Sequence, residues 1–355
     1  MSDVQKILII RFSSLGDILL ATPLIRVVRD AYPSAKIDFL TKLEYRDVLK
    51  FNPHLSSVIG LENSEFSTLR ELGSRLRIQQ YDLLLDIHNS LRSRYLRFRI
   101  HSHKTRVINK RSIRRFLLVH FKWNLYHGIV PVAERYLETV RFLNLPIDRK
   151  GLEVFLQEGI VGATTSMLDK YHLDRCTYVV GIVPTARHFT KRWPVEKFVD
   201  FGVELAQRHH VRFLIFGSRD DREFCSDLAQ MINARSGTSA AENLAGALSL
   251  LETAAAFDFC DVIVSNDSGL MHLGAARRRK IVGIFGSTVE EFGFFPYGTE
   301  HTVVENKMLG CRPCTPIGRS RCPKSHFRCM RDIHVRDVVR ATEEILMKKT
   351  THESA

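Results

Sequence analysis

The sequence predicts an α/β protein built from two Rossmann-like domains, and three observations support this prediction. The chain has 355 residues, which is enough for two domains of ordinary size. Its composition, with 45% hydrophobic and 26% charged residues, is normal for a globular protein. Apolar β-branched runs alternate with stretches of helical periodicity along both halves of the chain. We therefore expect one parallel sheet in each half.

The first half opens with a predicted strand–helix–strand unit. Strands are expected over Lys6–Arg11 and Lys36–Thr41, with a helix over Ile18–Tyr32 between them. The loop after the first strand holds one glycine and ends in Asp17, so it lacks the glycine-rich pattern of a dinucleotide-binding loop. Open α/β sheets carry their catalytic groups at the carboxyl ends of the strands. Asp17 is therefore either a catalytic carboxylate or an acidic cap of the following helix.

The remaining elements continue the same alternation. In the first half, we expect helices over Ser64–Gln80 and Glu134–Leu145, and a strand over Asp82–Ile87. In the second half, we expect strands over Thr177–Val183, Val211–Phe216, Val262–Val264 and Lys280–Phe285, and helices over Val195–His209, from about Arg222 to Ile232, and over Val335–Lys348. Residues from about Glu158 to Arg175 are typical of an interdomain crossing. The predicted domains are thus 1–165 and 176–330, followed by a closing helix and tail over 331–355.

An anion-binding loop is predicted in the stretch DVIVSNDSGLMHLGAA, Asp261–Ala276. A buried-type strand ends in turn and cap residues, and a helix follows, with Asp267 expected at its N-cap. The free backbone N–H groups of such a helix start, together with its dipole, favour a phosphate. The alternative is an ordinary capped helix after a strand.

Positive charge is concentrated in the first half of the chain. The formal net charge is +13, and no acidic residue occurs between Ile87 and Ala133. A solvated surface normally mixes charge signs, so this stretch, which includes Arg111, Arg114 and Arg115, indicates an anionic partner. Nucleic acid and a phosphorylated glycolipid at an anionic membrane surface both fit the charge alone.

Four of the seven cysteines gather near the C-terminus, at Cys311, Cys314, Cys322 and Cys329. The first two form a C-x2-C pair, a common half of a metal site, but the second two are more widely spaced than in a standard zinc ribbon. The segment 311–329 either holds a structural metal through four thiolates or consists of unligated thiols in an irregular loop.

Three segments, taken in order, resemble the ADP-heptose:lipopolysaccharide heptosyltransferases of glycosyltransferase family 9. They are KILIIRFSSLGDILLATPLIRVVRDAYPSAKIDFLT from Lys6, KRWPVEKF from Lys191, and NLAGALSLLETAAAFDFCDVIVSNDSGLMHLGAA from Asn243 with IVGIFGST from Ile281. The resemblance implies a GT-B fold, in which two Rossmann-like domains have parallel sheets facing across a cleft. It also implies that the closing helix returns to the first domain.

The resemblance assigns roles to particular residues. Asp17 matches the general base proposed for the family. Lys191 matches a lysine that contacts the donor's phosphates, although a lone lysine is by default a surface residue. Asp221 falls at the position of an acidic residue that binds the ribose, with Asp220 and helix capping as alternatives. The remaining expected donor-binding residues are Asp267, Ser268, Gly269 and His272.

The activity implied by the resemblance is heptose transfer from an ADP-sugar donor to a lipopolysaccharide acceptor of the Kdo–lipid A type. The arginines at 111, 114 and 115 would bind this acceptor on the first domain, so no nucleic acid partner is expected. No catalytic cofactor is expected, and a structural metal is considered only at the four cysteines. The chain starts without a signal-like segment, so we expect a cytoplasmic protein, in peripheral contact with the anionic inner membrane surface. The alternatives are another nucleotide sugar, a protein acceptor, or a non-catalytic protein that binds anionic glycolipid or nucleic acid.

Overall fold

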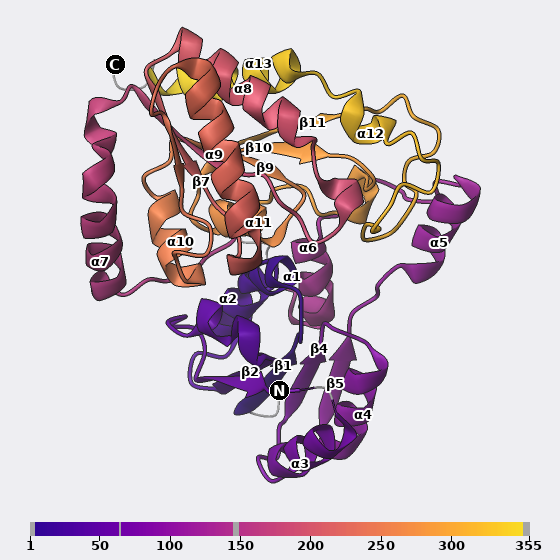
Figure 1. Ribbon diagram of the computed structural model, residues 1–355. Coiled ribbons are helices and arrows are strands. Elements are labelled where there is room, and N and C mark those ends of the chain that lie inside the picture. Colours follow the sequence, from indigo (N-terminus) through magenta and orange to yellow (C-terminus); the bar gives the residue numbers. More distant parts are fainter. Residues whose placement is uncertain (1–3, 64, 145–148, 351–355) are drawn as a thin grey trace. The chain divides into compact units, whose positions relative to one another are not determined.

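The computed structural model describes residues 4–63, 65–144 and 149–350 (Figure 1). The chain divides into two compact units. The first unit comprises Met1–Ser112 and Val130–Phe155, and the second comprises Ile113–Ile129 and Leu156–Ala355. The sequence-based division differs in two places, because residues 113–129 belong to the second unit and the second unit already begins at Leu156.

The first unit contains a five-stranded parallel sheet of order β3-β2-β1-β4-β5. Its central strand is almost wholly apolar and buried, as a strand covered on both faces requires. On one face, leucines of α3 and α4 pack against Leu8, Ile10 and Leu84. The strands are β1 (Lys6–Ile10), β2 (Lys36–Lys42), β3 (Ser57–Leu61), β4 (Leu83–Asp86) and β5 (Lys104–Val107). All four pairings are parallel, so the carboxyl ends of β1 and β4 lie together.

The helices of the first unit are short, and the predicted helix over Ile18–Tyr32 is in fact two helices. The break falls at Leu20–Ala21, just before Pro23 in the first turn of α2, where a missing N–H is tolerated. The Thr22 hydroxyl donates a hydrogen bond of 2.7 Å to the carbonyl of Leu19, the last residue of α1. The helices are α1 (Leu15–Leu19), α2 (Thr22–Ala31), α3 (Phe66–Arg77), α4 (Leu91–Ile100) and α6 (Val132–Leu137), with 3-10 turns η1 (Leu43–Leu49) and η2 (Glu138–Leu143).

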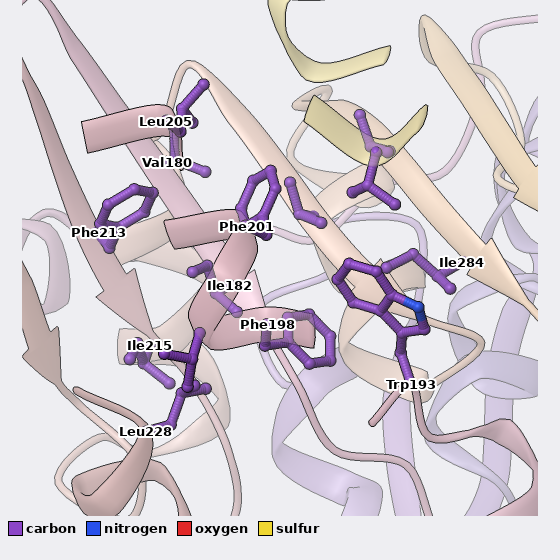
Figure 2. Packing of buried hydrophobic residues seen from close by; sticks show 14 of the residues in the cluster. Val180, Ile182, Trp193, Phe198, Phe201, Leu205, Phe213, Ile215, Leu228 and Ile284 are labelled. Atoms are coloured by element: carbon purple, nitrogen blue, oxygen red, sulfur yellow. The ribbon is translucent and has the colours of Figure 1, made fainter. Parts of the chain in front are cut away.

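The second unit contains a six-stranded parallel sheet of order β11-β10-β9-β6-β7-β8. Its strands are β6 (Tyr178–Val183), β7 (Val211–Ile215), β8 (Ala241–Asn243), β9 (Val262–Asn266), β10 (Lys280–Phe285) and β11 (His301–Glu305). The core between the sheet and helices α8 and α9 is shown in Figure 2, where Trp193 lies beside Ile284 and Phe201 lies beside Ile182. The strands predicted for this half are confirmed, whereas β8 and β11 were not predicted.

The helices of the second unit are α5 (Ser112–Phe121), α7 (Glu158–Leu168), α8 (Val195–Arg208), α9 (Arg222–Ser236), α10 (Leu250–Phe257), α11 (Gly269–Ala276), α12 (Arg328–Arg331) and α13 (Val335–Thr350). Short 3-10 turns are η3 (Asp169–Tyr171), η4 (Leu173–Arg175), η5 (Phe189–Lys191), η6 (Arg219–Asp221) and η7 (Glu290–Phe292). The segment predicted as an interdomain crossing forms helix α7, which packs on α10.

The closing helix also differs from its prediction. Helix α13 packs on α8 and on strands β9, β10 and β11, so it completes a layer of the second unit, where a return to the first domain had been predicted. Its buried side chains, including Val338, Val339 and Ile345, belong to the same core as Trp193. The apolar residues of α13 lie along one face of the helix, and this face is buried against the sheet of the second unit. Within the described residues, no helix combines the length and apolar character needed to cross a membrane.

Candidate active site

In the first unit, the candidate catalytic residue Asp17 lies just beyond the carboxyl end of β1. Its two carboxylate oxygens have different hydrogen-bond partners. Oδ2 accepts hydrogen bonds from the Ser14 backbone N–H at 3.1 Å and from the Ser14 hydroxyl at 2.9 Å, which caps α1. Oδ1 pairs with Nη2 of Arg11 at 2.7 Å and accepts a hydrogen bond from the Tyr136 hydroxyl at 3.2 Å. The predicted capping is therefore present, but it occupies only one of the two oxygens.

Asp17 is held ionised by its neighbours. Burial alone would raise its pKa, but the Arg11 charge and the hydrogen bonds from Ser14 outweigh burial, so the pKa of Asp17 lies below its ordinary value. Burial raises the pKa of the Tyr136 hydroxyl well above its ordinary value, so this group remains a proton-bearing donor. The site thus presents a carboxylate that is charged at neutral pH and fixed in orientation from two sides.

A neutral histidine accompanies this carboxylate. His88 follows β4, and its ring lies 4.8 Å from the Phe12 ring, centroid to centroid. Burial, assisted by the Arg11 charge, lowers the pKa of His88 to about 3. Its Nδ1 is buried and has no hydrogen-bond partner among the described residues. The sequence identified residues 88–90 only as a loop, since the pairing of β1 with β4 that brings His88 near Arg11 is not visible in local patterns.

In the second unit, helix α11 begins at the carboxyl end of β9, as predicted, but Asp267 is not its cap. Ser268 is the N-cap, and its Oγ accepts the Met271 backbone N–H at 3.3 Å. The helix lies close to the sheet, because a Cβ added at Gly274 would come within 2.6 Å of the Ile263 Cδ1 atom. The predicted strand–turn–helix is confirmed, with the cap moved by one residue.

Asp267 instead forms a buried ion pair. Its Oδ2 lies 2.7 Å from Nζ of Lys191 and accepts a hydrogen bond of 2.7 Å from the Thr288 hydroxyl. Only 6% of the Asp267 side chain and 14% of the Lys191 side chain are exposed. The predicted donor lysine therefore lies beside the start of α11, where its ammonium group is held by a carboxylate.

The loop that carries Lys191 is fixed to a segment of the cysteine-rich region. The Arg319 backbone N–H donates to the Thr190 hydroxyl at 2.9 Å, and the Thr190 N–H donates to the Arg319 carbonyl at 3.1 Å. Gly318 is required here, because its φ is +112° and an added Cβ would lie 2.5 Å from the His188 Cβ. An open pocket of about 700 Å³ results, lined by His188, Gly318, Arg319, Ser320, Arg321, Cys322, Pro323 and Ser325. Arg319 and Arg321 were not identified from the sequence.

His272 and Asp221 remain donor-site predictions. His272 lies on α11 and is 3% exposed. Asp221 closes a capping box, in which its Oδ2 accepts the Ser218 backbone N–H at 2.9 Å and the Ser218 hydroxyl at 2.5 Å. The neighbouring Asp220 is exposed. Helix capping, the alternative weighed for Asp221, is thus present.

The three arginines predicted to bind the acceptor do not lie in one unit. Arg111 belongs to the first unit and pairs with Glu138, Nη2 to Oε1 at 2.7 Å. Arg114 and Arg115 are half-buried on α5, in the second unit. The three arginines therefore do not form the single first-domain surface that was predicted. Helix α5 packs on the second unit, although the segments before and after it in the sequence belong to the first.

All four clustered cysteines are free thiols. Burial, and then the neighbouring thiols, raise the pKa of Cys329 to about 12, and the same two causes raise that of Cys314. Over residues 4–63, 65–144 and 149–350, no group of three or more His, Cys, Asp or Glu side chains is arranged to hold a metal ion. The structural metal at these cysteines therefore stays a prediction.

Comparison with known proteins agrees with this architecture. The family model described as glycosyltransferase family 9 (heptosyltransferase) matches residues 69–323. A lipooligosaccharide heptosyltransferase 2 of Campylobacter jejuni is 24% identical over 341 residues, covering 95% of this chain and 97% of that protein. A family 9 glycosyl transferase from Veillonella parvula has a TM-score of 0.81 at 21% identity, covering 98% of this chain and 99% of that one. The E. coli ADP-heptose lps heptosyltransferase II has a TM-score of 0.70 at 22% identity, covering 98% and 100%.

Proposed function

Because this chain belongs to glycosyltransferase family 9, the heptosyltransferases, we propose that it transfers heptose from ADP-L-glycero-β-D-manno-heptose to the inner core of lipopolysaccharide. The chain is a glycosyltransferase of the GT-B type, so the alternative of a non-catalytic binding protein no longer applies. The donor is proposed from a solved relative that is described as an ADP-heptose enzyme. The proposed location is the cytoplasm.

The observation that carries the proposal is the ionised, oriented carboxylate of Asp17 at the end of β1. Its Oδ1 is within 2.7 Å of Arg11 Nη2 and its Oδ2 is bonded to Ser14, so the group is fixed before any substrate arrives. In the proposed reaction, the acceptor hydroxyl oxygen attacks the anomeric carbon while the bond to ADP breaks on the opposite face, and the hydroxyl proton passes to Asp17. One displacement of this kind inverts the anomeric centre.

A carboxylate with a lowered pKa suits this step despite being a weak base. The transition state has oxocarbenium character, related to that of glycosidases, so the acceptor hydroxyl becomes acidic only as its bond to carbon forms. The proton therefore moves late, to a group that must simply be ionised and in position. Arg11 secures both properties.

The leaving group would be stabilised at α11. Its first-turn N–H groups and the positive end of its dipole favour a diphosphate. The Lys191 ammonium, now 2.7 Å from Asp267, has three donors and a flexible stem, so it can turn part of its hydrogen bonding to a phosphate oxygen. In this proposal Lys191 and the helix start supply the positive charge, so no divalent cation is required.

Calorimetric titration with ADP, UDP and GDP in the presence of EDTA tests the donor class. We expect ADP alone to bind, with the same affinity when Mg²⁺ replaces EDTA. A preference for UDP or GDP would contradict the ADP donor and leave the family membership intact. Binding that requires Mg²⁺ would contradict the proposed metal independence.

A second assay separates the acceptor from the donor. Transfer of labelled heptose is measured with Kdo-lipid A, with its deacylated saccharide, and with a protein extract. We expect transfer to both saccharide-bearing acceptors. Transfer to protein alone would favour the alternative of a protein acceptor.

A further inference from the structure

We propose that helix α5 and the residues after it form a surface that binds an anionic lipid bilayer. This α5 patch consists of large apolar side chains that are between 46% and 77% exposed, namely Ile113, Phe116, Phe121, Trp123, Leu125 and Ile129. They lie within 17 consecutive residues, 113–129, all in the second unit. Scattered exposed apolar residues are normal, but a contiguous group of this kind marks an interaction surface.

The α5 patch is held firmly on its inner side. Leu118 and Val119 are buried in a small apolar cluster with Phe292. The Lys122 ammonium donates to the carbonyls of Val119, Cys311 and Pro313 at 2.9, 3.1 and 2.6 Å. Figure 1 shows α5 next to the irregular segment that precedes α12. The outward apolar side chains are therefore displayed by a fixed element of the second unit.

The exposed aromatic rings of the patch form a continuous group. The Phe116 centroid lies 4.4 Å from that of His120 and 6.1 Å from that of Phe121. The Phe121 and Trp123 centroids are 5.4 Å apart. Tryptophan and phenylalanine above a fixed helix are typical of segments that lie in the headgroup region of a bilayer.

The positive charge of the segment favours binding to an anionic bilayer over binding to a second copy of the chain. Arg114 and Arg115 lie within the segment, and no acidic residue occurs between Ile87 and Ala133. A twofold contact would bring the same basic segment against itself, which costs free energy through repulsion. An anionic leaflet attracts the same charges.

This inference extends the proposed function, because lipopolysaccharide is a membrane lipid. It does not depend on the donor, the base or the acceptor hydroxyl. A protein that held this patch at the bilayer surface would meet its acceptor by diffusion in two dimensions. Loss of bilayer binding would then reduce transfer to vesicle-embedded acceptor and leave transfer to a deacylated, water-soluble acceptor unchanged.

The two tryptophans of the chain provide a built-in reporter. Trp123 is 60% exposed, whereas Trp193 is 1% exposed in the core of the second unit. We expect the emission of the intact protein to shift to shorter wavelength when vesicles of phosphatidylcholine and phosphatidylglycerol, without lipopolysaccharide, are added. Vesicles of phosphatidylcholine alone should give a smaller shift. Trp123→Phe should abolish the shift while most of the protein still sediments with the anionic vesicles.

A matched pair of variants completes the test. We expect the triple variant Phe116→Ser, Phe121→Ser, Trp123→Ser to lose vesicle binding by roughly tenfold or more, since three exposed rings are removed. The control is Phe66→Ser, at a side chain that is 66% exposed on α3, and it should bind like the unmodified protein. Absence of both the spectral shift and sedimentation would overturn the proposal. So would light scattering that shows a dimer abolished by the triple variant, because the patch would then bind a second copy.

Discussion

The two units each hold a largely buried carboxylate next to a cation beyond the end of a central strand, but they use different cations. In the first unit Arg11 pairs with Asp17, which also accepts hydrogen bonds from Ser14 and Tyr136. In the second unit Lys191 pairs with Asp267, whose other partner is Thr288. Arginine has a rigid planar fork, whereas lysine has a single charge on a flexible stem. We infer that Arg11 holds the Asp17 carboxylate in one orientation, and that Asp267 holds the Lys191 ammonium group where a ligand can reach it.

This difference matters for the proposed reaction, because the carboxylate is the functional group in the first pair and the ammonium is the functional group in the second. In the proposed reaction, Asp17 receives a proton, so its neighbours must leave it ionised and still. The Lys191 ammonium group donates a hydrogen bond to a phosphate oxygen, so Asp267 must hold the lysine in place without occupying all of its donors. The experiments below test this contrast, from the largest expected effect to the smallest.

Replacement of the fixed carboxylate should have the largest effect. For Asp17→Asn we expect kcat to fall by about 10²- to 10⁴-fold, the range typical of general base catalysis, because the amide cannot take the acceptor proton. ADP affinity, measured by calorimetry, should change little. The control is Asp30→Asn at an exposed position on α2, which should keep full activity. A kcat within about threefold of the unmodified enzyme would rule out Asp17 as the base.

Replacement of the mobile cation should weaken donor binding. For Lys191→Met we expect ADP affinity to fall by about 10- to 100-fold, because one charge-assisted hydrogen bond of about 1.5–3 kcal/mol is lost. Calorimetry provides the measurement. Lys307→Met is a suitable control, since that side chain is 73% exposed and also pairs with a carboxylate, that of Glu305. Equal affinities for both variants would mean that Lys191 serves only to neutralise Asp267.

The pH profile should separate the role of Arg11 from that of a simple structural ion pair. In Arg11→Met only burial and the Ser14 and Tyr136 contacts remain, and burial raises the pKa of Asp17. The acid limb of the kcat/KM profile, which follows ionisation of the base, should move to higher pH. Arg94→Met, at an exposed position on α4, should leave the limb in place. An unchanged limb in Arg11→Met would contradict Asp17 as the titrating group.

The same lowered pKa has a consequence for stability. A carboxyl group with a folded-state pKa below its unfolded value stabilises the fold above the unfolded value, about 3.9 for Asp, and loses this contribution as the pH falls through the folded value. The free energy of unfolding of the unmodified enzyme should therefore decrease below about pH 4. In Arg11→Met the contribution of Asp17 to this decrease should disappear.

The smallest effect is expected at the helix cap of the second unit. Ser268→Ala removes the hydroxyl that accepts the Met271 N–H and should cost about 1 kcal/mol in the free energy of unfolding. Urea denaturation measures it, and Ser268→Thr should retain most of the stability. A loss of less than about 0.5 kcal/mol would be no larger than that of an ordinary surface substitution, and the cap would then contribute little.

Much of the fold could be predicted from local patterns. The strands around Lys6–Ile10 and Val262–Asn266 are apolar runs followed by turn residues, and both are present. The strand–turn–helix at Ser268 was also predictable. What failed was the choice between neighbours, since Asp267 and Ser268 are both good caps. Asp267 is not the helix cap, because Lys191 and Thr288, which are distant in sequence, bind its carboxylate.

Long-range partners account for the other missed features. Arg11 and Tyr136 define the chemistry of Asp17, yet Tyr136 is separated from it by 119 positions. Helix α5 was assigned with its sequence neighbours to the first domain, because the partners that hold it, such as the Cys311 carbonyl, come much later in the chain. Periodicity detects an apolar face but does not tell which surface covers it.

The docking of α5 also bears on how the chain is made. Lys122 bonds to the Cys311 carbonyl 189 residues further on, so at roughly 5–20 residues per second a ribosome releases the two partners about 10–40 seconds apart. During that interval the first unit already has all of its own strands, while the aromatic segment between its two parts still lacks its support. The docking of α5 is thus completed only by the cysteine-rich region, and premature termination before Cys311 would remove two of the three carbonyl partners of Lys122, far upstream of the lost residues.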